Sequence, residues 1–155
     1  MGEVIISDAN EFDLPQIYEI ERTSFPTPYP EGLLRAYLFI AEGLYLVARE
    51  DGQIKGYCIG VIQYRHRGHV ISIATKVDSR RKGIGSMLLN EMENRFQILG
   101  SKYSYLEVDY KNIDAISFYR KHGYIVVGLK RNYYGRNRHA LIMIKPLPST
   151  RVLES

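Results

Sequence analysis

The chain has 155 residues, of which 45% are hydrophobic and 25% charged, proportions typical of a globular domain and not of a disordered or collagen-like chain. Lysine and arginine outnumber aspartate and glutamate by 21 to 17, a net charge of +4 that does not by itself indicate nucleic-acid binding. The single cysteine, Cys58, excludes an internal disulfide and a multi-cysteine zinc site. No segment approaches the ~20 apolar residues of a membrane helix. We therefore expect one cytoplasmic domain, with no metal and no membrane or direct nucleic-acid partner.

The first half of the chain predicts two helices and then three strands. After a short strand at Val4–Ile6, apolar residues three apart predict a helix that begins near Asp13. Three prolines within Phe25–Pro30 end helical structure, because proline lacks a backbone donor and fixes φ, so this segment is expected to be a shaped loop. A second helix is expected over Glu31–Ile40. Three strands follow, the first two joined by an Asp-Gly turn: Leu44–Ala48, Ile54–Ile62 and His69–Val77.

The second half alternates helices with strands. A helix opens around Gly83–Ser86, with apolar residues spaced by four along one stripe, and Gly100 ends it. The remaining elements are expected in the order strand, helix, strand, strand: Tyr103–Asp109, Ala115–Lys121, Tyr124–Leu129 and His139–Ile144. Between the last two strands, Arg131–Arg138 is expected to be a basic connection, and residues 148–155 a tail. This order favours an open mixed sheet with helices on both faces.

The strongest local motif is the turn Arg80–Ser86, which lies between a predicted strand and a predicted helix. Its glycines let successive N–H groups and the N-terminus of the helix converge on an anion. Three consecutive cations before the first glycine add charge complementarity to a di- or triphosphate. The turn is neither a Walker A loop nor the dinucleotide G-x-G-x-x-G. The alternative is an ordinary glycine-containing connection beside a solvated basic run.

Here a resemblance to a known family becomes specific. The segment His69–Val77, the R-x-x-G-x-G motif that starts at Arg80, and Leu88-Leu89 resemble the acetyl-CoA signature of the GNAT N-acetyltransferases. Within that superfamily the chain looks most like the protein N-terminal acetyltransferases, including the ribosomal-protein alanine acetyltransferases. The resemblance implies a GNAT domain over residues 1–147. Such a domain is an α/β fold with a mixed, mostly antiparallel sheet of about seven strands and about four helices.

The resemblance also implies acetyl-CoA as co-substrate and the residues that hold it. The glycine turn would wrap the pyrophosphate, the backbone of the preceding strand would pair with the pantetheine arm, and two later side chains would contact the cofactor. The implied cofactor-binding residues are Ile73, Ala74, Thr75, Arg81, Lys82, Gly83, Ile84, Gly85, Ser86, Asn112 and Tyr119. Ser86 departs from the family pattern, in which arginine is frequent at this position.

Two residues are implied to carry the chemistry. Glu107 lies mid-strand, where alternation puts it on one face with Tyr105 and Asp109. A carboxylate there is either a solvated surface group or a site residue. The resemblance implies the second, with Glu107 as general base, acting directly or through water. Tyr119 would alone be interpreted as a core tyrosine, but it matches the family's acid that protonates the CoA thiolate. The four histidines show no metal-ligand spacing, and His69 is expected to be a packing residue at a strand end.

Amine basicity favours an α-amino group as acetyl acceptor. Neutralising a lysine at pH 7 costs about 4.6 kcal/mol, against about 1 kcal/mol for an α-amine. The resemblance implies that the segments Phe25–Glu31 and Arg131–Arg138 form walls of a peptide groove. Tyrosine hydroxyls there can hold a peptide backbone while the rings pack on its first residues. The implied substrate-binding residues are Tyr29, Tyr133 and Tyr134, and the alternative is that these rings only cap the core.

The sequence therefore predicts an enzyme that transfers the acetyl group of acetyl-CoA to the free α-amino group of protein N-termini by direct attack in a ternary complex. Ribosomal proteins are among the candidate targets. Two alternatives stay open: acetylation of a lysine side chain or a small amine, and a non-catalytic acyl-CoA-binding module.

Overall fold

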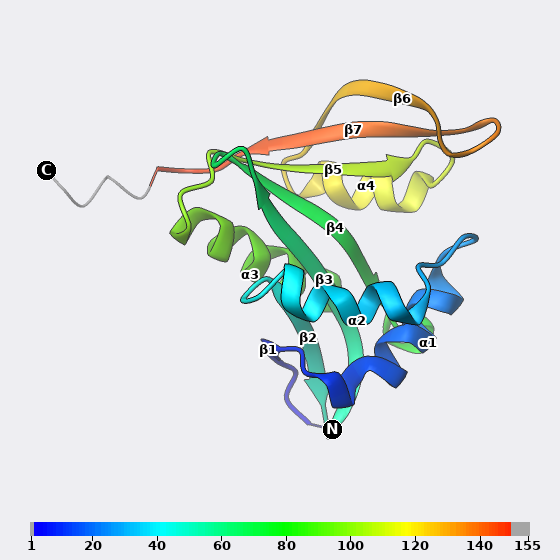
Figure 1. The fold of residues 1–155 in the computed structure, drawn as a ribbon, viewed down its shortest axis with the longest axis vertical. Coiled ribbons are helices and arrows are strands. Elements are labelled where there is room, and N and C mark those ends of the chain that lie inside the picture. The colour runs from blue at the N-terminus through cyan, green and yellow to red at the C-terminus, as the bar shows by residue number, and fades with distance from the viewer. Residues whose placement is uncertain (1, 150–155) are drawn as a thin grey trace, which may run out of the picture. The chain divides into compact units, whose positions relative to one another are not determined.

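The computed structural model describes residues 2–149, which form two compact units (Figure 1). Unit 1 contains the chain up to Val61 together with Val70–Arg95, and unit 2 contains Ile62–His69 and the chain from Phe96 onward. Each unit is described by itself below. The prediction of a single domain over residues 1–147 stays a prediction, and of the expected tail only 148 and 149 are among the described residues.

The described residues form seven strands and four α-helices. Short 3-10 turns at Glu11–Asp13 and Val77–Ser79 precede α1 and α3. The elements in chain order are β1 (Ile5–Asp8), α1 (Leu14–Ser24), α2 (Glu31–Ile40), β2 (Tyr45–Glu50), β3 (Gln53–Gln63), β4 (Arg67–Thr75), α3 (Ile84–Ile98), β5 (Tyr103–Asp109), α4 (Ile113–Lys121), β6 (Ile125–Gly135) and β7 (Arg138–Pro146).

The strands hydrogen-bond in the order β1-β2-β3-β4-β5-β7-β6. The pairs β1–β2, β2–β3, β5–β7 and β6–β7 are antiparallel, and β4–β5 is parallel. The sheet is therefore mixed and mostly antiparallel, as predicted. None of the described helices combines the length and apolarity that crossing a bilayer requires.

In unit 1, helices cover both faces of β3, as the element order predicts. A β-carbon added at Gly56 would lie 3.0 Å from the side chain of Leu88 of α3, so α3 packs its side chains directly on the backbone of β3 on this face. The next residue, Tyr57, points to the opposite face, where its hydroxyl bonds to Glu21 of α1. Figure 1 shows α2 passing in front of the strands of this unit. Unit 1 is thus a helix–sheet–helix sandwich built on fully buried residues.

Local sequence signals explain most element boundaries. The Asn10 side chain caps the 3-10 turn Glu11–Asp13, which precedes α1, by accepting a hydrogen bond from the N–H of Phe12 at 2.9 Å. Asp51 and Gly52 have φ of 53° and 78°, the positive values that a two-residue hairpin turn requires. Four apolar residues spaced by four make the buried stripe of α3: Ile84, Leu88, Met92 and Phe96. Gly100, with φ of 93°, follows the end of this helix.

The prediction that Arg131–Arg138 is a loop was wrong. β6 runs on to Gly135, which pairs with Arg138 of β7, so only two residues form the turn. The pairing is irregular between Lys130 and Gly135, and Asn132 there has φ of 56°. Its N–H donates to His139 Nδ1 at 2.8 Å. This hydrogen bond links β6 to β7 within the irregular stretch. Because β6 continues to Gly135, Tyr133 and Tyr134 belong to this strand and not to a loop.

Gly68 tests the packing at the start of β4. A β-carbon at this position would lie 2.3 Å from the ring of Phe96, which is fully buried. We expect Gly68→Ala to lower the free energy of unfolding by about 1–3 kcal/mol, because a crowded core must shift to accept the methyl group. The measurement is urea denaturation followed by circular dichroism. Gly32→Ala is the control, because nothing lies within 4 Å of its added β-carbon; equal stability of both variants would contradict this packing.

Candidate active site

Glu107 of β5 is the centre of a charged cluster in unit 2. Its Oε1 lies 2.7 Å from Nε2 of His69, and its Oε2 lies 2.8 Å from Nζ of Lys130. The hydroxyl of Tyr105 donates to Oε2 at 3.1 Å. Only 6% of the Glu107 side chain is exposed. A carboxylate has about four acceptor positions, so three donors leave one position for an amine N–H or a water.

The strand register brings these side chains together. β4 and β5 run parallel with His69 opposite Tyr105, and Tyr105 and Glu107 share a face because they are two residues apart. On the other side β7 separates β5 from β6. Lys130 of β6 pairs with Ala140 of β7, a small residue whose neighbour two positions along pairs with Glu107. The long lysine side chain therefore reaches across β7 to the carboxylate.

Aromatic rings and cations surround the same carboxylate. The ring of His69 stands edge-on to Tyr105, with centroids 5.0 Å apart. The guanidinium of Arg67 lies 4.0 Å from the Tyr105 centroid, within the range of a cation–π contact. The ammonium of Lys130 lies 5.1 Å from the centroid of Tyr133. The cluster thus holds one carboxylate and two cationic side chains among aromatic rings.

Two opposing effects set the charge of Glu107. Burial alone would raise the pKa of the carboxyl, but the hydrogen bonds from His69 and Lys130 outweigh burial and lower the pKa from 4.5 to about 2. The hydrogen bond to Glu107 in turn raises the pKa of Lys130. The carboxylate is therefore ionised and the lysine protonated at neutral pH. An ionised carboxylate only accepts, so Nε2 of His69 must donate to it.

From its place at a strand end, His69 is predicted to be a packing residue, but the structure places its Nε2 2.7 Å from Glu107. Its Nδ1 is buried and has no hydrogen-bond partner among the described residues, so its interaction with Glu107 is what orients the ring. The contact between His69 and Glu107 follows from the parallel pairing of β4 with β5. That pairing puts His69 beside Tyr105, on the face that also carries Glu107. The residue pattern of one strand does not predict which strand it pairs with.

The other predicted residues of unit 2 lie on α4 and β6. Tyr119 is 8% exposed, and its ring centroid lies 5.7 Å from that of Tyr124. Asn112 caps α4, because its Oδ1 accepts from the N–H of Ala115 at 3.1 Å. Tyr133 and Tyr134 stand edge-on with centroids 4.9 Å apart, and 47% of Tyr133 is exposed. The structure thus gives Tyr119 and Asn112 structural contacts and leaves Tyr133 accessible.

In unit 1 the glycine turn has the backbone that an anion cradle needs. Arg81 and Gly83 have φ of 63° and 82°, and nothing lies within 4 Å of a β-carbon added at Gly83. α3 begins at Ile84, so its first N–H groups face out of this open turn. Arg80 is anchored instead, because it donates to the carbonyl of Thr75 at 3.1 Å and to Ser24. Arg81, Lys82 and Gly83 are exposed.

The loop that carries Tyr29 is held by a buried carboxylate of unit 1. Glu21 is 2% exposed, and its Oε2 accepts from the backbone N–H of Tyr29 at 2.9 Å. The hydroxyls of Tyr57 and Ser72 bond to its other oxygen. The predicted loop Phe25–Pro30 is therefore an ordered segment tied to α1.

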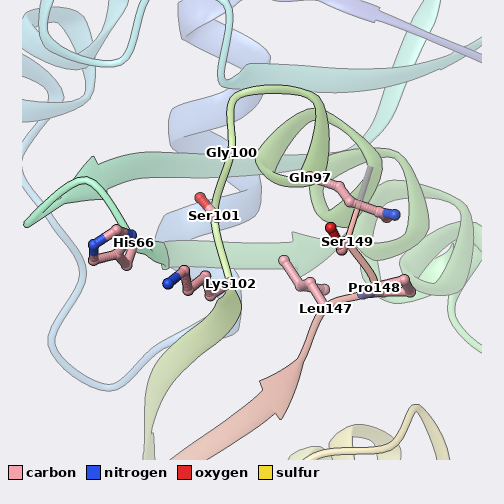
Figure 2. A pocket seen from close by; sticks show the side chains of 8 residues that line it. All are labelled: His66, Gln97, Gly100, Ser101, Lys102, Leu147, Pro148 and Ser149. Atoms are coloured by element: carbon pink, nitrogen blue, oxygen red, sulfur yellow. The ribbon is translucent and has the colours of Figure 1, made fainter. Parts of the chain in front are cut away.

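A separate cavity of about 660 Å³ lies at the other end of β5 in unit 2. Figure 2 shows its lining: His66, Gln97, Gly100, Ser101, Lys102, Leu147, Pro148 and Ser149. None of the residues predicted for the site lines it. No group of three or more histidine, cysteine or acidic residues in the described part of the chain has the arrangement of a metal site.

The comparisons with known proteins identify the class. The acetyltransferase (GNAT) family model matches residues 14–124, and the chain belongs to this family of enzymes. An uncharacterized N-acetyltransferase of Methanocaldococcus jannaschii is 37% identical, over 96% of this chain and 95% of its own length. An N-alpha-acetyltransferase of Sulfurisphaera tokodaii is 33% identical over 94% of each chain. The ribosomal-protein-S18-alanine N-acetyltransferase of Escherichia coli has a similar structure, with a TM-score of 0.84 and 26% identity over 96% of each chain.

The lowered pKa of Glu107 predicts a pH-dependent contribution to stability. A carboxyl whose pKa is depressed by folding stabilises the folded state above its unfolded value, here 4.5, and loses that contribution as pH falls toward about 2. The shift corresponds to about 3 kcal/mol. We expect the stability gap between wild type and Glu107→Gln to shrink by up to that amount over this interval, measured by urea denaturation at several pH values. Glu42→Gln, at an exposed position, is the control, and a gap that does not change with pH would contradict the assignment.

Proposed function

We propose that this protein acetylates the free α-amino group of protein N-termini, with acetyl-CoA as the acetyl donor. The observation that carries the proposal is the buried, ionised Glu107 held by His69 in a member of the acetyltransferase family. The relative named N-alpha-acetyltransferase and the similar S18-alanine N-acetyltransferase support a protein N-terminus as the acceptor. Ribosomal proteins are accordingly among the proposed targets.

The chain has residues that fit acetyl-CoA. The open turn at Gly83, with its positive φ, and the exposed cations Arg81 and Lys82 suit a pyrophosphate. The register of β4 with β5 ends at His69, so later residues of β4 have no β5 partner in that register. We assign Ile73, Ala74 and Thr75 to the pantetheine arm, and Ile84, Gly85, Ser86, Asn112 and Tyr119 to further contacts, as the family resemblance implies. When bound, acetyl-CoA supplies a thioester carbonyl and a thiol leaving group.

Glu107 is the proposed general base. Taking a proton from a free α-ammonium of pKa near 8 would cost a carboxylate of pKa about 2 about 8 kcal/mol. Glu107 therefore suits an acceptor amine that arrives neutral and gives up its proton, directly or through a water, as the new C–N bond forms. His69 and Tyr105 fix the carboxylate in position through their hydrogen bonds.

Tyr119 is the proposed general acid for the departing thiolate. A phenol carries its proton at neutral pH, which a general acid must, and Tyr119 lies largely buried on α4. Tyr29, Tyr133 and Tyr134 are the proposed contacts of the acceptor peptide. The ordered loop behind Tyr29 and the exposure of Tyr133 support this assignment.

A panel of short peptides tests the function. We expect acetyl-CoA-dependent thiol release with free N-termini and loss of that release when the same N-termini are blocked, because only an α-amine is neutral in useful amount at pH 7. Peptides with acidic second residues should react best, because Arg131 and Arg136 are exposed cations on the β6–β7 hairpin. A polyamine and a peptide with a blocked N-terminus and one internal lysine complete the panel. Equal rates on the blocked lysine peptide would instead favour a lysine acetyltransferase.

Two variants test the assigned chemistry. Glu107→Gln should lower kcat by about 100-fold or more, the usual contribution of a general base, while acetyl-CoA affinity measured by calorimetry stays within a factor of a few. Tyr119→Phe should slow thiol release and leave peptide KM largely unchanged. Thr27→Val, in the loop of Tyr29, is a comparison that removes a hydroxyl elsewhere. Wild-type turnover in both Glu107→Gln and Tyr119→Phe would remove these residues from the mechanism.

A further inference from the structure

Lys130 is a residue of the charged cluster that the proposed chemistry does not use. Its ammonium occupies one oxygen of Glu107 at 2.8 Å, yet 41% of its side chain is exposed. The same ammonium lies 5.1 Å from the centroid of the exposed Tyr133 ring, so Lys130 contacts the carboxylate and also reaches solvent. An acceptor amine bound at Glu107 would therefore lie within a few ångströms of this cation.

The charge balance of the cluster is positive. Glu107 contributes one negative charge, and Lys130 and Arg67 contribute two positive ones around the ring of Tyr105. The next carboxylate on this face, Asp109, is already paired with Arg138 at 3.4 Å. His69 and Tyr105 face Glu107 as donors. A protonated amine would therefore meet a cluster whose central carboxylate is already paired with a cation.

We propose that Lys130 is a specificity-determining residue that repels protonated amines from Glu107 and so admits only neutral acceptors. The inference deepens the proposed function and rests on it. Like charges at a few ångströms repel measurably even where solvent screens them. The ion pair also holds Lys130 in its protonated form, so the enzyme's own lysine is a poor acceptor.

If only neutral amines are admitted, the pKa of the acceptor amine determines which substrates react. At pH 7 an α-amine of pKa near 7.7–8.0 is neutral in about one molecule in ten, whereas a lysine side chain is neutral in fewer than one in a thousand. A site that admits only neutral amines therefore favours α-amines by about 300-fold before any contact with the peptide is counted. A site with an unpaired carboxylate would lose part of this preference, because a carboxylate without the cation attracts ammonium groups and is a stronger base toward their protons.

A matched pair of capped peptides tests the inference. One carries an N-terminal trimethylglycyl group, a permanent cation; the other carries 3,3-dimethylbutanoyl, its neutral isostere. In the wild type we expect the cationic peptide to inhibit about tenfold more weakly than the neutral one. In Lys130→Met the two inhibition constants should become equal or reverse, because Glu107 is then unpaired. Lys130→Arg keeps the charge and should behave as the wild type.

The outcomes separate this inference from the proposed function. If the wild type acetylates free peptides but the ratio of the two inhibition constants is the same in Lys130→Met and wild type, Lys130 has no such role. If the wild type acetylates no peptide, the proposed function fails, and the two capped peptides can still be compared by calorimetry. Lys130→Gln is a second neutral variant, and circular dichroism checks the fold of each protein. A fall in the α-amine to lysine rate ratio in both neutral variants would support the inference independently.

Discussion

The site in unit 2 depends on keeping one carboxylate charged where little water reaches it. Removing an ion from water costs several kcal/mol unless partners replace the lost hydration. Three strands supply those partners to Glu107: β4 brings His69, β5 brings Tyr105, and β6 brings Lys130 across β7. Any shift of register by one residue would turn one of these side chains to the other face. The parallel pairing of β4 with β5 and the position of β7 between β5 and β6 are therefore needed to keep Glu107 charged, as well as to form the fold.

Unit 1 also contains a buried carboxyl group, Glu21, which is held by different donors. Glu21 is more deeply buried than Glu107, but its contacts are the hydroxyls of Tyr57 and Ser72 and the N–H of Tyr29, with no cation among them. Neutral donors fix the geometry of a carboxylate without adding a charge to its surroundings. Glu21 accordingly ties the loop of Tyr29 to α1, whereas the charged partners of Glu107 also set what can approach it. One buried carboxylate is suited to holding a loop and the other to discriminating between ligands.

Sequence patterns predicted most of the fold because most of its elements are determined locally. The apolar stripe of α3 and the Asp-Gly hairpin turn need only neighbouring residues, and both were confirmed. The end of β6 was not predictable in this way, because Asn132 crosses an irregularity by bonding to His139 on the partner strand. His69 and Lys130 stand 38 and 23 positions from Glu107, so only the strand register brings them together. The resemblance selected Glu107 and implied its role, but its partners are a property of the sheet.

The partners of Glu107 also limit how it can act. Donors that lower the pKa of a base keep it ionised at every working pH, but they make each proton transfer to it less favourable. A base with a pKa of about 2 cannot prepare an ammonium for attack; it can only take the proton that the reaction itself makes acidic. The acceptor amine must therefore already be neutral when it binds. A weak base beside a fixed cation is therefore a coherent design for α-amines, whose own pKa lies close to neutrality, and a poor one for lysine side chains.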